Sequence, residues 1–235
     1  MKKKLVVLTG AGISAESGIK TFRDADGLWE GHDVNSVATP EGFNINPALV
    51  LEFYNQRRRE LKKVQPNLGH LILAELEKDF DITIITQNVD NLHERSGSSK
   101  VIHLHGELTK VQSTKNPHYI IDWTSDLNIG DVDEEGYQLR PNIVWFGEEV
   151  PAMEIAISLT QQADYLAIIG TSLQVYPAAG LVHHTQPNCR VYYIDPKPVS
   201  LYNLQNPLEV IAKTATEGIP ILKDKLISLH DNKST

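Results

Sequence analysis

Cysteine is nearly absent from this chain, and that scarcity excludes two common ways of stabilising a small fold. Cys189 is the single cysteine among 235 residues, so the chain has neither an internal disulfide nor a cluster of thiolates for a zinc ion. Long apolar runs are also missing, because no segment approaches the roughly 20 residues that cross a bilayer. The apolar stretch after Met1 stops at Thr9 and Gly10, too early for a signal peptide. We therefore expect a cytoplasmic protein without membrane contact.

An excess of positive charge is missing as well. The chain has 22 lysines and arginines against 30 aspartates and glutamates, for a net charge of −8. Because a general nucleic-acid binder has the opposite balance, we expect no nucleic-acid partner. Hydrophobic residues make up 41% and charged residues 22% of the chain, which is typical of a globular protein of one or two domains.

Short apolar runs alternate with amphipathic stretches along the chain. The runs predict strands at Leu5–Leu8, Ile82–Thr86, Val101–Leu104, Ile143–Phe146, Tyr165–Ile169, Val191–Ile194 and Val210–Ala212. The amphipathic stretches predict helices near 47–64, 68–79, 152–162, 177–185 and 219–229. Most of the runs are apolar throughout, as in parallel strands covered on both faces. The alternation predicts an α/β fold with a doubly wound parallel sheet.

A glycine turn follows the first predicted strand. The run Gly10–Ala15 fits the pattern G-x-G-x-x-G/A, in which Gly10 permits the turn and Gly12 lets the backbone approach a pyrophosphate. Ser14 and Ser17 add hydroxyl donors. A purely structural glycine turn is the alternative. No acidic residue ends a second strand about 20 residues later, which disfavours an ordinary dehydrogenase.

Several further motifs follow the glycine turn in order, and together they resemble the sirtuins, the NAD-dependent protein-lysine deacylases. The motifs are Gly10-Ala11-Gly12-Ile13-Ser14-Ala15-Glu16-Ser17-Gly18-Ile19, Thr21-Phe22-Arg23-Asp24, Gly27-Leu28-Trp29, Thr86-Gln87-Asn88-Val89-Asp90-Asn91-Leu92-His93, His103-Leu104-His105-Gly106, Val144-Trp145-Phe146-Gly147-Glu148 and Gly170-Thr171-Ser172-Leu173. The resemblance extends from residue 5 to about 218. It implies a Rossmann-like part at about 1–19, 71–106 and 142–235, with a smaller part inserted at about 20–70 and 107–141. We expect one catalytic domain that is monomeric.

The resemblance also implies the chemistry. NAD is consumed as a co-substrate, and its nicotinamide leaves while the acyl-lysine oxygen attacks the ribose. The products are nicotinamide, O-acyl-ADP-ribose and free lysine. His105 is the expected general base, since imidazole titrates near neutral pH. The expected NAD-binding residues are Gly10, Ala11, Gly12, Ile13, Ser14, Glu16, Ser17, Phe22, Arg23, Trp29, Gln87, Asn88, Val89, Asp90, Gly170, Thr171, Ser172, Asp195 and Ala215.

The helix predicted at 47–64 has an arginine on its apolar face. At 100° per residue, Tyr54 and Arg57 lie on the core-facing stripe, whereas Arg58 and Arg59 point away and are expected to be solvated. Pairing of Arg57 with a structural carboxylate is one interpretation. The other is an anion site, because Tyr54 and Arg57 resemble the pair that recognises succinyl or malonyl groups in the desuccinylase class. The other expected substrate-binding residues are Val144, Phe146, Gly147 and Glu148, which offer an edge for a peptide strand or form a covered core strand.

The chain departs from the family at two places. Most sirtuins carry paired cysteines for a structural zinc, and residues 107–143 have none, so we expect no bound zinc and packing around Tyr119, Ile120, Ile121, Trp123 and Tyr137 instead. The fold of this segment stays open. Asp195 replaces an asparagine, and its charge would repel a 2′-phosphate, so we expect NAD rather than NADP. Ala215 aligns loosely with an adenine contact.

The sequence therefore favours an NAD-dependent protein-lysine deacylase that removes succinyl, malonyl and also acetyl groups from proteins. Two other functions remain open at this point. A protein ADP-ribosyltransferase shares the first bond cleavage, although the presence of His105 favours deacylation. A non-catalytic NAD sensor binds the cofactor without turnover.

Overall fold

A parallel sheet of six strands forms the larger part of the protein, whose computed structural model describes residues 2–20, 28–29 and 31–231. The strand order is β11-β10-β9-β1-β4-β5, and every neighbouring pair is parallel. The prediction of a doubly wound α/β fold is therefore confirmed. These strands are β1 Lys4–Thr9, β4 Asp81–Thr86, β5 Val101–His103, β9 Tyr165–Ile169, β10 Arg190–Ile194 and β11 Leu208–Ile211.

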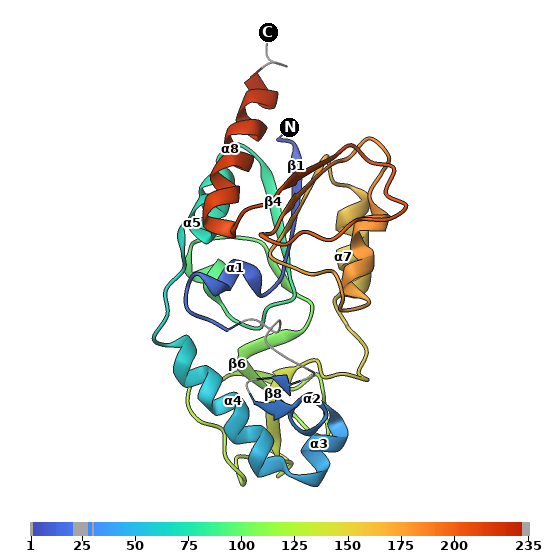
Figure 1. Cartoon of the computed structure of the whole chain (residues 1–235). Coiled ribbons are helices and arrows are strands. Elements are labelled where there is room, and N and C mark those ends of the chain that lie inside the picture. The colour runs from blue at the N-terminus through green and yellow to red at the C-terminus, as the bar shows by residue number, and fades with distance from the viewer. Residues whose placement is uncertain (1, 21–27, 30, 232–235) are drawn as a thin grey trace.

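Helices cover both faces of this sheet (Figure 1). They are α1 Gly12–Ala15, α5 Leu68–Leu76, α6 Leu92–Arg95, α7 Met153–Gln161, the 3₁₀ helix η1 Ala178–His184 and α8 Ala215–Asp231. Alternate residues of β1 face opposite ways: Leu5 packs in the core under α5 and α8, whereas Val6 packs under α7 and η1. Burial on both faces explains why the strands are apolar throughout. Within the described residues, no helix is long and apolar enough to cross a membrane.

The smaller part lies at the end of the molecule away from both termini (Figure 1). It contains β2 Leu28–Trp29, β3 His32–Asp33, α2 Val34–Val37, α3 Pro40–Ile45, α4 Pro47–Leu61, β6 Gly106–Ser113, β7 Ile120–Asp122 and β8 Leu139–Ile143. Strands β7-β6-β8 form an antiparallel sheet whose core includes Leu108, Val111 and Leu139. The exact boundaries of the two parts stay a prediction.

Two sequence expectations for this part were wrong. Ile120 and Tyr137 do not form its core, since their exposed fractions are 45% and 41%. Ile120 lies in β7, where alternate residues point to solvent, whereas Tyr137 directly follows an exposed turn at residues 134–136. The strand expected at Ile143–Phe146 lies earlier, because β8 ends at Ile143 and residues 145–148 form a turn.

Helix α4 begins where its sequence predicts. The Asn46 side chain accepts a hydrogen bond from the Leu49 N–H, and Pro47 occupies the first helical position. The apolar stripe is buried as expected, with Phe53 and Tyr54 exposed by 1% and 0%. Helix α4 therefore presents one face to the core of the smaller part.

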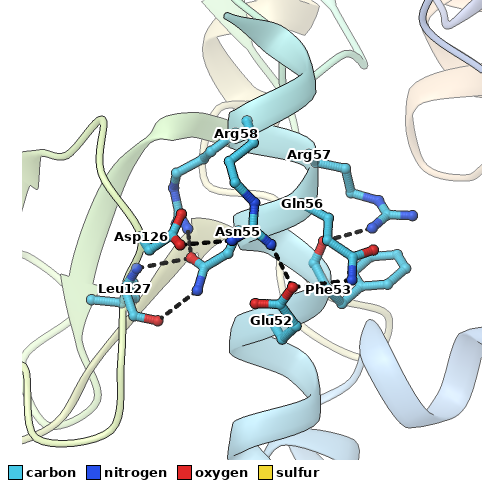
Figure 2. A network of polar contacts seen from close by, with 9 residues as sticks. Glu52, Phe53, Asn55, Gln56, Arg57, Arg58, Asp126 and Leu127 are labelled. Atoms are coloured by element: carbon cyan, nitrogen blue, oxygen red, sulfur yellow. Dashed lines mark hydrogen bonds and ion pairs between the residues drawn. The ribbon is translucent and has the colours of Figure 1, made fainter.

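The expectation that Arg58 is solvated was wrong, because its exposed fraction is 2%. Arg58 donates from Nε to the Leu108 carbonyl at 2.9 Å and from Nη1 to Asn55 Oδ1 at 2.7 Å. Asn55 in turn pairs with the backbone of Leu127, accepting from its N–H at 2.8 Å and donating to its carbonyl at 3.0 Å. Figure 2 shows this network on the side of α4 opposite Arg57. The backbone at Leu108 and Leu127 therefore covers a second face of α4, beside the face that carries the apolar stripe.

Candidate active site

A cavity of about 570 Å³ lies at the carboxyl ends of the parallel strands. From β1 the sheet grows in one direction through β4 and in the other through β9, and ligands of open α/β sheets bind at such a switch point. Gly10 follows β1 and Gly170 follows β9, and both glycines line the cavity. The volume is within the range of cofactor and small-molecule sites.

The glycine turn owes its glycines to contact with the end of β9. A Cβ on Gly12 would lie 2.6 Å from the Gly170 Cα, and one on Gly10 would lie 2.7 Å from the Thr171 Cβ. The Gly12 N–H donates to the Gly170 carbonyl at 2.8 Å. Close backbone packing therefore requires both glycines. From the sequence, Gly12 was explained only by the approach of a pyrophosphate, and this contact with Gly170 was not predicted. Gly10, Ala11 and Gly12 also line the cavity, so this part of its wall carries no side chain larger than a methyl group.

A buried polar network joins the glycine turn to the loop after β4. Ser14 Oγ donates to Asp90 Oδ2 at 2.9 Å, and Asn88 Nδ2 donates to the Gly10 carbonyl at 3.2 Å. Burial raises the pKa of Asp90, while the bonds from Leu92 N–H and Ser14 lower it. Ser17 accepts from Asn67 Nδ2 at 3.0 Å. These contacts fix the side chains that line the cavity floor.

His105 lies at the cavity wall just after β5. Its Nδ1 is 3.0 Å from the Gln87 carbonyl, and a carbonyl only accepts, so Nδ1 carries the proton in the neutral ring. Nε2 then has the lone pair that a general base uses. Burial lowers the pKa of His105, although the bond to Gln87 opposes this. The imidazole is therefore neutral at pH 7 and able to accept a proton.

His103 occupies the same face of the chain two residues earlier. Its Nδ1 is 3.0 Å from the Asn88 carbonyl and its Nε2 is 2.7 Å from Glu94 Oε1. Burial lowers the pKa of His103, but the hydrogen bond and the charge of Glu94, together with the Asn88 carbonyl, outweigh it, and the net shift is upward. Two histidines thus bind the carbonyls of consecutive residues 87 and 88, and the pKa is shifted upward at His103 but downward at His105.

The Tyr54 ring lines the cavity, whereas Arg57 lies behind this wall. The Arg57 guanidinium stacks 3.3 Å from the centre of the Phe53 ring and 5.5 Å from that of Trp29, which lines the cavity. Its Nη1 donates to the Phe53 carbonyl at 2.5 Å. Figure 2 shows that Arg57 points away from the Arg58 network. Of the two residues that the sequence predicted for the acyl group, Tyr54 lines the cavity, and Arg57 lies beside the lining residue Trp29.

Residues 144–148 are not the strand edge that we expected for a peptide. The N–H groups of Val144 and Phe146 donate to the His105 and Ala38 carbonyls, so they are used within the chain. Gly147 has a φ of 90°, which closes a turn. Glu148 binds Arg140 rather than pointing into open space.

Most of the expected site residues line this one cavity. Those that do are His105, Gly10, Ala11, Gly12, Ser14, Glu16, Trp29, Gln87, Asn88, Val89, Asp90, Gly170, Thr171, Ser172, Asp195, Tyr54, Val144, Phe146, Gly147 and Glu148. Ile13, Ser17, Arg57 and Ala215 are not among its lining residues. Phe22 and Arg23 lie outside the described residues.

Sequence reasoning missed several lining residues, of which Trp145, Ala38 and Lys197 are examples. Trp145 stands between Val144 and Phe146 in a motif that was recognised, so the sequence could have included it as a site residue. Ala38 has no sequence signal because a turn of the smaller part brings it there. Among the described residues, no three His, Cys, Asp or Glu side chains gather to hold a metal ion.

Comparison with known proteins places the chain among close relatives. The model of the Sir2 family matches residues 10–177. A protein of Helicobacter pylori named NAD-dependent protein deacylase is 58% identical over 97% of this chain and 99% of its own length. One of the same name from Bacteroides thetaiotaomicron is 57% identical over 96% and 98%. A solved Sir2 homologue in complex with NAD has a TM-score of 0.85 and 37% identity, covering 97% of this chain and 91% of that one.

Proposed function

The chain belongs to the Sir2 family and is an NAD-dependent protein deacylase, and we propose that it favours acyl-lysines whose acyl group ends in a carboxylate, such as succinyl- and malonyl-lysine. NAD is its co-substrate, and acylated proteins are its partners. The proposal concerns the identity of the acyl group and the roles of the individual site residues.

We assign the NAD site to the cavity at the carboxyl ends of the strands. The turn at Gly10, Ala11 and Gly12 fits a pyrophosphate, because it lines the cavity with no side chain larger than a methyl group. Asn88 and Asp90 hold the ribose and the carboxamide, and Asp195, which is 1% exposed at the end of β10, accepts hydrogen bonds from the ribose on the adenine side. NAD supplies the leaving group and the ribose carbon that the acyl oxygen attacks.

His105 is the proposed general base for a ribose hydroxyl. Its protonated Nδ1 is held by the Gln87 carbonyl at 3.0 Å, which orients the ring and leaves Nε2 to accept the proton. Burial lowers the pKa of His105, so this acceptor is available at neutral pH. The ring therefore supports proton transfer within the cavity without rearrangement of its strand.

One observation carries the proposed acyl preference: α4 carries three consecutive arginines, and of these Arg57 lies beside Trp29, a residue that lines the cavity. Arg58 binds Asn55 and the Leu108 carbonyl, and Arg59 forms ion pairs with Glu52 and with Asp126, the latter at 2.7 Å. Arg57 instead stacks on the rings of Phe53 and Trp29, of which Trp29 lines the cavity. A long flexible side chain in that position reaches a carboxylate that enters beside Tyr54.

The wild-type protein tests this preference directly. We expect NAD-dependent removal of succinyl and malonyl groups to exceed removal of acetyl when acetyl-, malonyl-, succinyl- and glutaryl-lysine versions of one peptide are compared by kcat/KM. Mass spectrometry should detect O-succinyl-ADP-ribose as a product. A peptide that gains ADP-ribose instead would indicate ADP-ribosyl transfer, and an absence of acyl-dependent nicotinamide release would indicate a sensor.

Arg57→Met is expected to suppress desuccinylation selectively. The loss of a cation that pairs with a buried carboxylate costs about 2–5 kcal/mol, or about 30- to several-thousand-fold in kcat/KM, whereas a small neutral acetyl group leaves the arginine unused. Steady-state rates with succinyl and acetyl peptides measure the difference.

The matched control for this prediction is Arg59→Met, which removes an exposed arginine from the same helix. We expect it to leave both activities near the wild-type values. Equal losses of both activities in Arg57→Met would instead assign Arg57 a structural role.

A further inference from the structure

The hydroxyl of Tyr54 receives a hydrogen bond whose direction is fixed by chemistry. Trp145 Nε1 lies 3.0 Å from the Tyr54 Oη, and the two residues are exposed by only 2% and 0%. An indole N–H donates and never accepts, so the Tyr54 oxygen is the acceptor. The proton of the Tyr54 hydroxyl must therefore point away from Trp145. Among the residues that the structure describes, no acceptor for that proton is found.

Trp145 is itself held by a partly buried ion pair. Arg140 donates from Nη1 and Nη2 to the two carboxylate oxygens of Glu148 at 2.8 and 2.9 Å. Glu148 Oε2 also accepts from the Trp145 backbone N–H at 2.8 Å. The Arg140 guanidinium lies 3.9 Å from the centre of the Trp145 ring. The indole is thus fixed from its backbone and from its face, which fixes its N–H as well.

These contacts end at the cavity that holds His105. Tyr54, Trp145 and Glu148 all line it. Burial raises the pKa of Tyr54, although the bond from Trp145 opposes this, so the phenol stays protonated at any pH at which the protein works. Because the Tyr54 oxygen already accepts a hydrogen bond from Trp145, its own O–H group is left to donate one.

We propose that Trp145 is a positioning residue for acyl selection: its indole N–H holds the Tyr54 hydroxyl so that the hydroxyl proton faces the carboxylate of a succinyl or malonyl group. This inference rests on the proposed function. In this inference Trp145 does not contact the acyl group and acts on it through Tyr54. Glu148 then positions Trp145 and does not bind the peptide.

A double-mutant cycle tests the inference. Trp145→Phe removes the N–H and keeps an aromatic ring beside Arg140. We expect it to lower the ratio of succinyl to acetyl kcat/KM about tenfold, mainly through the KM for the succinyl peptide. The ratio does not depend on the folded fraction of the sample, so partial misfolding does not imitate this result. In a Tyr54→Phe background, the same substitution is expected to leave the ratio unchanged, because the hydroxyl through which it acts is absent.

Trp123→Phe is the matched control, since the Trp123 indole N–H donates to the Asp126 carbonyl at 3.2 Å and Trp123 does not line the cavity. It should leave the ratio at the wild-type value. A wild-type succinyl preference that survives Trp145→Phe, or an equal effect in the Tyr54→Phe background, would overturn the inference alone. A wild-type protein without succinyl preference would overturn the proposed function and this inference with it.

Discussion

His105→Ala is expected to lower O-acyl-ADP-ribose formation by about 10²- to 10⁴-fold, which is the contribution typical of a positioned general base. The reason is that His105 is the neutral imidazole at the cavity, with Nδ1 bound to the Gln87 carbonyl at 3.0 Å and Nε2 left to accept the ribose proton. Affinity for NAD should change little, because in the proposed site the glycine turn and Asp195 bind the rest of the dinucleotide. Product formation by mass spectrometry and NAD binding by calorimetry measure the two quantities.

The step at which His105 acts gives a sharper form of this test. In the proposed mechanism the base is needed after nicotinamide leaves, so exchange of labelled nicotinamide into NAD should fall less than product formation does. Because burial lowers the pKa of His105, the ring stays unprotonated down to a pH below the ordinary imidazole value of about 6.5. The wild-type kcat/KM should therefore fall only below that pH, and the residual rate of the variant should lack this fall.

His118→Ala serves as the control, since it removes an exposed imidazole of the smaller part and should leave the rates unchanged. Full turnover by His105→Ala would remove the assignment of the base. A fall of kcat/KM at low pH that persists unchanged in that variant would also remove the assignment, because another group would then be the one that titrates.

The sequence predicted well which loops line the cavity, because the relevant signals are local. A glycine turn after β1, an amide loop after β4 and a His-Leu-His run after β5 each follow a strand that apolar residues identify. Parallel strands bring their carboxyl ends to one edge, so these loops had to meet. What the sequence did not give was the reason for Gly12, because the contact with Gly170 joins positions far apart in the chain.

The smaller part was predicted less well because its contacts are not periodic. Helical periodicity placed Tyr54 and Arg57 on the covered face of α4, but it assumed a single covered face. The segment that carries Leu108 and Leu127 covers a second one, which is why Arg58 is buried against expectation. In β7, alternate residues point to solvent and leave Ile120 exposed, and Tyr137 follows an exposed turn before β8.

Asn55→Leu is expected to be the most destabilising single change in the smaller part. Asn55 is 3% exposed and satisfies the N–H and the carbonyl of Leu127 together with Nη1 of Arg58. Leucine has the same number of side-chain heavy atoms and the same branch point but no polar atoms, so it leaves these buried groups unpaired. Burial lowers the pKa of Arg58 only to about 10, so a full charge is among them at neutral pH. We expect a loss of about 3–5 kcal/mol in the free energy of unfolding, measured by urea denaturation.

Two further variants separate this explanation from a general intolerance of α4 to leucine. Gln56→Leu changes the next residue, whose side chain is exposed and bonds only to Glu52, and should cost about 0.5 kcal/mol or less. Asn55→Leu combined with Arg58→Met should be more stable than Asn55→Leu alone, because the double variant no longer buries an unpaired cation. A loss below about 1 kcal/mol for Asn55→Leu would mean that the backbone pairing of β6 with β8 holds the segment in place by itself. The polar network on α4 would then be a consequence of the fold and not one of its supports.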